Sequence, residues 1–234
     1  MSILLQIVQN GTELTDSLGL ITPEESTGGA LDVLKLIWKG GIVMIPIGIL
    51  FIIAIFLTFE RYLSIKKAGN LDPMFMGGIK EMVTEGDLRG AQRLCHSKAT
   101  PMALMIEKGL SRIGKPLKDI SVAVENVGKL EVYKLEKGMP LLATISGAAP
   151  MLGFLGTVTG MIRTFNQMQD SGQQITSNLL SGGIGEAMMT TVAGLVVGIF
   201  AYISYNLLSS MINKVVYKME ATSVEFLDIL HEPA

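Results

Sequence analysis

The residue of this sequence most able to do chemistry is Glu186, a carboxylate that stands directly before a long charge-free stretch, 187–213. An ionisable group at membrane depth costs at least about 2.5 to 3.5 kcal/mol and is normally kept for a function such as ion transfer. A helix that begins near Ser181 would place Glu186 in its opening turns, where the helix dipole favours an acid. A helix that begins near Ile175 would place it well inside the membrane, and the spacing leaves both interpretations open.

Two threonines in apolar surroundings, Thr157 and Thr191, are the next candidates. A hydroxyl both donates and accepts hydrogen bonds, so it can line a water-filled path or hold a carboxylate without carrying charge. A membrane threonine more often bonds back to its own helix. Thr191 is also about 140° around a helix from Glu186, so the two side chains need not face the same direction.

Glycines recur at three- or four-residue steps in the same two regions, and each set therefore marks one face of a helix. The set comprises Gly153, Gly156, Gly160, Gly194 and Gly198. Small residues let helix backbones approach closely, so tight packing alone could explain them. No Gly-Lys-Ser/Thr follows, so they do not form a nucleotide-binding loop.

Cys95 and its neighbour His96 give only a weak hint of a metal site, and a single cysteine excludes an intramolecular disulfide. We expect Cys95 to be a small buried thiol. We expect no metal, no cofactor, no nucleic-acid partner and no catalytic residue.

These candidates lie in a chain of membrane composition. Of the 234 residues, 49% are hydrophobic and 17% charged, against about 25% charged in a soluble domain. Residues 40–59, 138–162 and 187–213 contain no Asp, Glu, Lys or Arg. Each stretch approaches or exceeds the roughly 20 residues that a helix needs to cross the hydrocarbon core. The sequence therefore predicts an all-α membrane protein with three spanning helices, 42–63, 138–162 and 175–206.

The distribution of Lys and Arg predicts the orientation. Two precede the first span, fourteen lie between the first and second, one lies between the second and third, and two follow the third. Positive charge stays on the cytoplasmic side. We therefore expect a periplasmic N-terminus, a short periplasmic connection over 163–174 and a cytoplasmic C-terminus.

The segments outside the spans also have expected structures. Residues 1–29 are predicted to be an external arm, and 30–41 either an interfacial amphipathic helix or a simple extension of the first span. Residues 64–137 are predicted to form a cytoplasmic helical domain whose last helix, from Pro116, runs on into the second span. The apolar stripe of 207–234 predicts a cytoplasmic helical tail, so spans two and three should extend inward as a helical hairpin.

The two later spans resemble the ExbB/TolQ/MotA proton-channel family, and its ExbB and TolQ branch most closely. The resemblance rests on Leu142-Ala143-Thr144-Ile145, Ala149-Pro150-Met151-Leu152-Gly153-Phe154-Leu155-Gly156-Thr157-Val158, Gly183-Ile184-Gly185-Glu186-Ala187 and Thr191-Val192-Ala193-Gly194-Leu195. It covers roughly residues 137–213. Thr190 departs from the small apolar residue frequent in relatives, and Arg163 aligns with no family feature.

The resemblance implies a homo-oligomeric ring, a pentamer, whose second and third spans surround the membrane segment of a single-span partner of the ExbD or TolR type. It implies that an Asp of that partner carries the proton within a ring of threonines at the positions of Thr157 and Thr191. Glu186 would belong to the same pore, and Pro150 with the five glycines would pack the helices around it.

The function implied is a motor subunit of the bacterial inner membrane. With a TonB- or TolA-type energy transducer, it would use the proton motive force to energise TonB-dependent outer-membrane transport. A TolQ-like role in envelope maintenance is one alternative, and a non-conducting membrane scaffold is another of a different class. An independent transporter is weaker, because the three spans show no internal repeat.

Overall fold

The computed structural model describes residues 41–70, 72, 74–170 and 177–231. All of them belong to one compact unit, Gly40–Ala234. The expected external arm, 1–29, and all of the expected interfacial segment except Gly41 lie outside the described residues.

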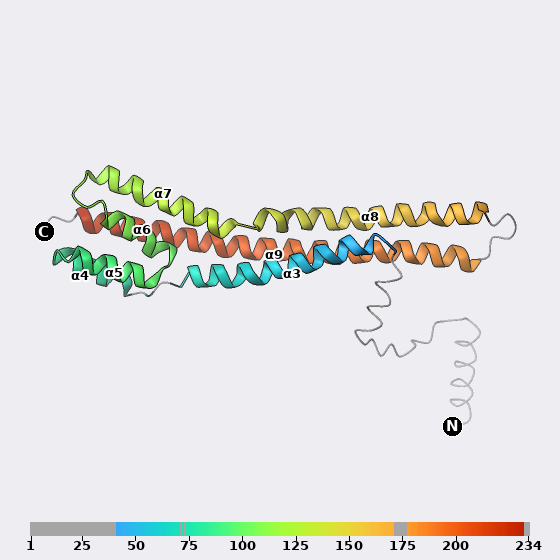
Figure 1. Cartoon of the computed structure of the whole chain (residues 1–234), viewed down its shortest axis with the longest axis horizontal. Helices are drawn as coiled ribbons and strands as arrows, with labels where there is room; N and C mark the ends of the chain where they lie inside the picture. The colour runs from blue at the N-terminus through green and yellow to red at the C-terminus, as the bar shows by residue number, and fades with distance from the viewer. Residues whose placement is uncertain (1–40, 71, 73, 171–176, 232–234) are drawn as a thin grey trace, which may run out of the picture. The chain divides into compact units, whose positions relative to one another are not determined.

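The described part of the chain consists of helices with no strand among them, as expected (Figure 1). The helices are α3 (Met44–Ala68), α4 (Phe75–Thr84), α5 (Leu88–Lys98), α6 (Pro101–Leu110), α7 (Leu117–Glu136), α8 (Met139–Asp170) and α9 (Ser177–His231).

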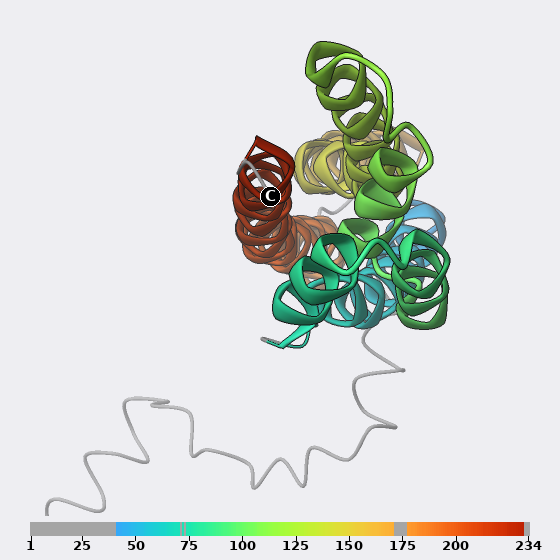
Figure 2. The same cartoon turned by 90° about the vertical axis from the view of Figure 1, so that its left-hand side faces the viewer.

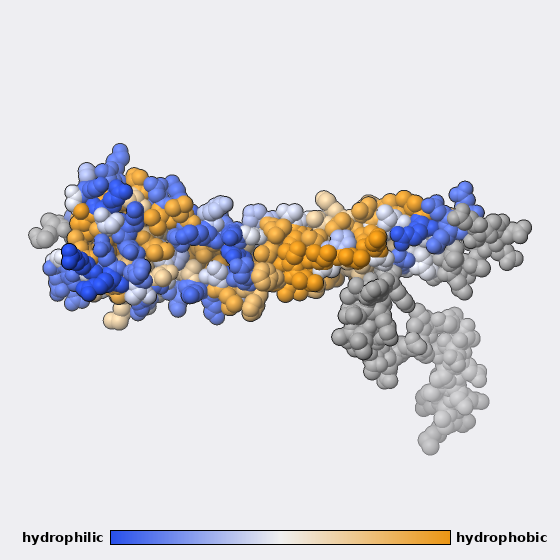
Figure 3. All heavy atoms as spheres, in the orientation of Figure 1, coloured by the Kyte–Doolittle hydropathy of each residue, from blue (hydrophilic) through white to orange (hydrophobic). Residues whose placement is uncertain are grey.

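Three helical stretches are long and apolar enough to cross a membrane: Met44–Ala68, Leu117–Gln169, which joins α7 to α8, and Gly182–His231. On the face drawn in Figure 3, the apolar residues of these helices form a hydrophobic band between two hydrophilic ends. Side chains of α3 such as Ile52 and Phe56 are 69% and 65% exposed within the chain. The described residues thus contain the three candidate membrane helices that the sequence predicts, and the first presents an apolar surface suited to lipid.

The α9 helix explains how membrane and non-membrane parts are joined. Its 55 residues extend about 80 Å at 1.5 Å per residue, far more than a hydrocarbon core of about 30 Å. The helix therefore continues unbroken beyond the apolar band and supplies the scaffold for the short helices. Helices α4, α6 and α7 contact α9, and the end-on view of Figure 2 shows α4 to α7 gathered beside the C-terminal end of the chain.

The expected continuous helix from Pro116 into the second span is interrupted. Helix α7 ends at Glu136, Lys137 has an extended ψ of 127°, and α8 begins at Met139. Between them Gly138 has a φ of +83°, a left-handed conformation that glycine adopts without steric penalty. Apolar residues recur at helical spacing both before and after Gly138, so the sequence pattern did not indicate this break.

A small hydrophobic core holds the short helices against α9. Phe226 of α9 is fully buried in the same hydrophobic core as Ile106 and Val124, which come from α6 and α7. At Gly109 of α6 an added Cβ would overlap the Phe226 ring. The core thus ties the end of α9 to the α6–α7 pair by close packing.

Candidate functional site between helices α8 and α9

Helices α8 and α9 lie side by side (Figure 1), and small residues bring their backbones together. A Cβ added at Gly153 would lie 3.0 Å from the Thr190 carbonyl oxygen and 3.2 Å from the Gly194 Cα. One added at Gly160 would lie 2.9 Å from the Ala187 Cβ. These glycines of α8 therefore face α9 directly, as their spacing predicts.

The proline inside α8 is part of the same contact. A Cβ at Gly198 would lie 2.5 Å from Pro150 Cγ and 3.1 Å from the Ser146 carbonyl oxygen. Pro150 has no N–H to donate to that oxygen. Glycine at 198 leaves room for the proline ring, so the two residues fix the separation of the helices at this level.

The two predicted threonines meet across the contact. Thr191 Oγ1 lies 3.3 Å from Thr157 Oγ1 and 3.1 Å from the Gly153 carbonyl oxygen. Thr157 Oγ1 donates to the Phe154 carbonyl oxygen at 2.6 Å. When Thr191 donates to Gly153, the protons of both hydroxyls are used within the chain and their lone pairs stay free to accept. We call Thr157 and Thr191 the hydroxyl pair.

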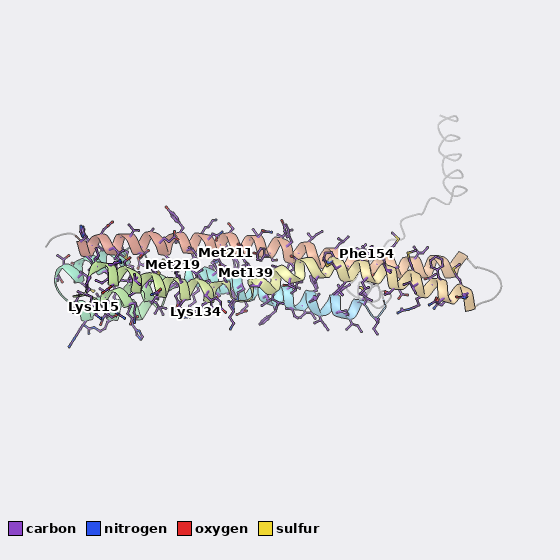
Figure 4. All side chains as sticks on the ribbon, turned by 90° about the horizontal axis from the view of Figure 1, so that it is seen from above. Lys115, Lys134, Met139, Phe154, Met211 and Met219 are labelled. Carbon is purple, nitrogen blue, oxygen red and sulfur yellow. The ribbon has the colours of Figure 1, made fainter. Side chains whose placement is uncertain are left out.

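A large apolar side chain lies one turn from the hydroxyl pair on each of the two helices. Phe154 on α8, labelled in Figure 4, is 67% exposed within the chain, and Met188 on α9 is 62% exposed. Both lie one turn from a threonine of the pair, on the same side of its helix. The half-buried hydroxyls are therefore a polar spot on an apolar surface that this single chain leaves uncovered.

Thr190, which departs from the family pattern, has a packing role in this geometry. Its side chain is only 2% exposed, and a Cβ at Gly156 would overlap it. Its hydroxyl donates to the Ala187 carbonyl oxygen at 2.7 Å. The Thr190 side chain thus fills the space next to Gly156.

Glu186 is paired with a cation. Its Oε1 lies 3.5 Å from Nη1 of Arg163 on α8, and the two side chains are 34% and 53% exposed. Glu186 also lies against Gly41, where an added Cβ would overlap Oε1. Gly41 has a φ of +68°, so this position requires glycine both for its backbone and for the close approach.

These contacts place Glu186 between the two positions that the sequence left open. The carboxylate is nine residues into α9, so it lies beyond the opening turns where the helix dipole acts. It is nevertheless level with the start of the first spanning helix, because it lies against Gly41. Glu186 therefore sits at the rim of the apolar band, where Arg163 stabilises it.

The three predicted site residues do not gather at one point. Glu186, Arg163 and Gly41 line a small hollow with Thr159 and Thr190, and the described lining includes neither Thr157 nor Thr191. Thr191 is about 140° around α9 from Glu186. The acid and the hydroxyl pair thus lie on opposite edges of the α8–α9 contact, and Thr191 lies about 7.5 Å further along the helix axis.

Sequence reasoning missed Arg163 and Gly41. Arg163 carries the only positive charge between the second and third charge-free stretches, and this isolation was the available signal. Pairing it with Glu186 needs the register of α8 against α9, which periodicity along one helix does not supply.

Cys95 and His96, the two residues that gave a weak hint of a metal site in the sequence, differ in burial. Cys95 is fully buried in the core, while the His96 side chain is 85% exposed, with Nδ1 3.9 Å from Glu107 Oε1. Burial, with a smaller contribution from Glu107, raises the pKa of the Cys95 thiol to about 12. Cys95 is therefore a structural, unreactive thiol.

Comparison with known proteins adds a family match. A model of the MotA/TolQ/ExbB proton channel family matches residues 97–221. The chain is 31% identical over 175 residues to biopolymer transport protein ExbB-like 1 of Synechocystis sp., a match covering 74% of this chain and 69% of that protein.

Shorter matches occur in both branches of that family. Biopolymer transport protein exbB1 of Vibrio cholerae is 38% identical over 90 residues, covering 38% of this chain and 40% of that protein. Tol-Pal system protein TolQ of Haemophilus influenzae is 35% identical over 104 residues, covering 44% and 45%. The family match spans the hydroxyl pair, Arg163 and Glu186.

Proposed function

Because this multi-pass membrane chain belongs to the MotA/TolQ/ExbB proton channel family, we propose that it is the channel-forming subunit of a motor in the bacterial inner membrane. Five copies form a ring around the membrane segment of an ExbD/TolR-type partner. The proton motive force drives this complex, which passes force to a TonB-type transducer and so energises outer-membrane transport.

The observation that carries this proposal is the contact between Thr157 and Thr191. Their oxygens are 3.3 Å apart on an otherwise apolar surface. With both protons donated within the chain, their lone pairs can accept a hydrogen bond from a protonated carboxyl group. If the hydroxyls rotate, they can donate to the same group once it is ionised. Five such pairs would form a polar belt around the partner's Asp.

Glu186 has a different role in this proposal. It lies at the rim of the apolar band, paired with Arg163 at 3.5 Å. We place this pair at the periplasmic end of the pathway, where it sets the local charge, while the hydroxyl pair contacts the moving proton. Each proton gains about 2.3 kcal/mol per 100 mV of membrane potential.

The test is proton flux through the purified complex with its single-span partner, reconstituted in liposomes under an imposed potential. Thr157→Val and Thr191→Val keep the side-chain shape and remove the hydroxyl. Each should lower the flux at least about tenfold, since one lost hydrogen bond to a charged group is worth roughly 1.5 to 3 kcal/mol.

Thr144→Val is the matched control, because the Thr144 hydroxyl is exposed on α8 and donates at 2.9 Å to the Pro140 carbonyl oxygen of its own helix. It should leave the flux unchanged. Wild-type flux in both hydroxyl-pair variants would reject the motor and favour the scaffold hypothesis.

A TolQ-like role in envelope maintenance is the second candidate, supported by the match to the TolQ of Haemophilus influenzae. The two roles differ in the transducer engaged. Deletion of this chain in its source organism should abolish gradient-dependent uptake at the outer membrane in the first case. Leakage of periplasmic proteins with normal uptake would support the second.

A further inference from the structure

A groove of about 560 Å³ lies where the end of α3 meets α9. Its apolar part includes Leu63, Met211 and Val215, and its rim carries Lys66, Lys67 and Lys214. Figure 4 labels Met211 on α9. No acidic residue is among the described residues that line the groove, so it combines an apolar floor with a positive rim.

The lysines lie at the depth of a lipid headgroup layer. A hydrocarbon core of about 30 Å takes 20 helical residues, which from Met44 reaches Leu63. Lys66 and Lys67 follow within about 6 Å, inside the headgroup zone. On α9, Lys214 is the first charge after the stretch 187–213.

Two of these charges are uncompensated. Lys67 and Lys214 are exposed and make no ion pair with any residue that the structure describes. Lys66 Nζ lies 5.8 Å above the ring of Tyr62. Lys218 is used structurally, since its Nζ donates to the Gly69 carbonyl oxygen at 3.0 Å and ties the end of α3 to α9. The groove therefore has a fixed wall and free cations at its mouth.

We propose that this groove binds an anionic phospholipid of the leaflet on the α4–α7 side, with its phosphate at Lys67 and Lys214 and one acyl chain along Leu63 and Met211. Basic pockets between spanning helices recognise anionic headgroups in this way. A zwitterionic lipid offers the same acyl chain without net negative charge, so the lysines select the anionic headgroup.

The experiment measures lipid retained by the purified complex from detergent containing equal amounts of phosphatidylglycerol and phosphatidylcholine, by native mass spectrometry. Wild-type protein should retain phosphatidylglycerol. Lys67→Gln with Lys214→Gln should retain roughly 25-fold less, because each lysine near an anionic surface contributes about fivefold.

Two controls make this result specific. Lys115→Gln with Lys118→Gln removes two exposed charges next to the start of α7 and should behave as wild type. Lys67→Arg with Lys214→Arg keeps the charge and should still retain the lipid, which shows that loss in the Gln variant does not reflect misfolding.

Equal retention by the Lys67→Gln, Lys214→Gln protein would overturn the proposal. So would protection of both lysines from amine labelling in lipid-free detergent, because a neighbouring copy of the chain would then cover the groove. Inorganic phosphate at millimolar concentration should not displace the lipid, since it lacks the acyl chain; displacement would also overturn the proposal.

Discussion

At the rim of an apolar span a carboxylate depends on the cation that faces it, and in this chain that cation is Arg163. The Arg163 Nη1 to Glu186 Oε1 distance of 3.5 Å and the partial exposure of both side chains describe a pair that water still reaches. Such a pair keeps Glu186 compatible with its position without deep burial of a charge. This is why we assign the moving proton to the neighbourhood of the hydroxyl pair.

Removing the charge of Arg163 or of Glu186 should destabilise the protein, because the remaining charge then has no partner at the edge of the apolar band. We expect Arg163→Gln and Glu186→Gln each to lower the midpoint temperature of unfolding in detergent. A double-mutant cycle should give a coupling of up to about 1 kcal/mol, because solvent screens partly exposed pairs. The exchange Arg163→Glu with Glu186→Arg should recover most of the loss. The more exposed pair of Glu125 with Lys129 is the comparison. Zero coupling between Arg163 and Glu186 would contradict an electrostatic role.

The buried thiol of Cys95 makes stability depend on alkaline pH. Its folded-state pKa of about 12 lies above the value of about 8.5 expected in the unfolded chain. Above about pH 8.5 the unfolded state loses the thiol proton and the folded state keeps it, so the free energy of unfolding falls as pH rises toward 12.

The measurement is the unfolding midpoint of wild type and Cys95→Ala between pH 7.5 and about 10.5. Every other ionisable group is common to both proteins, so the difference between the two curves isolates the thiol. Wild type should lose stability more steeply with rising pH than Cys95→Ala. Parallel curves would show that Cys95 ionises equally in both states.

At the scale of helices, the glycine faces of α8 and α9 make a strong prediction. A Cβ at Gly194 would lie 2.5 Å from the Ala149 carbonyl oxygen and 2.8 Å from the Gly153 Cα. Both are backbone atoms that cannot rotate away, so Gly194→Ala must separate the helices. Overpacking of this kind typically costs about 1 to 3 kcal/mol, which should lower the unfolding midpoint in detergent.

Gly147→Ala is its control on α8, since nothing in the described chain lies within 4 Å of the added Cβ. Alanine is the better helix former by about 1 kcal/mol, so this variant should be neutral or stabilising as an isolated chain. If Gly194→Ala is tolerated as well as Gly147→Ala, close backbone contact is not what joins the two helices.

The glycine faces also show what sequence alone could predict. Gly153, Gly160 and Gly194, which recur at three- and four-residue steps, lie in the contact between α8 and α9. The charge-free stretches correspond to three helices that are long and apolar enough to cross a membrane. Relative register is different, because it depends on which small residues meet, as Gly153 meets Thr190 and Gly194. The Arg163–Glu186 pair follows from that register and was therefore not predictable.

The break between α7 and α8 escaped prediction for a related reason. Apolar periodicity continues on both sides of Gly138, whereas the break depends on one residue with φ of +83°. A glycine in a helical pattern is usually tolerated at a modest cost, so its presence does not announce a break. Interactions between helices and single backbone conformations are thus the information that the linear pattern lacks.

At the scale of the whole molecule, α9 joins a membrane part to a group of short helices, and the proposed orientation puts that group in the cytoplasm. The only native cysteine is buried, so a Cys95→Ala background allows new cysteines to report sidedness. We place them at two exposed positions on opposite sides of the apolar band: Lys115, labelled in Figure 4, and Asn166 near the far end of α8.

A membrane-impermeant maleimide applied to spheroplasts should label Asn166→Cys and spare Lys115→Cys, because only the end of α8 beyond the apolar band would face the medium. After lysis both should react, which controls for accessibility. Labelling of Lys115→Cys alone in intact spheroplasts would show that the chain has the opposite orientation. The fourteen Lys and Arg residues between the first two spans would then lie outside, against the electrical gradient that normally retains such charge in the cytoplasm.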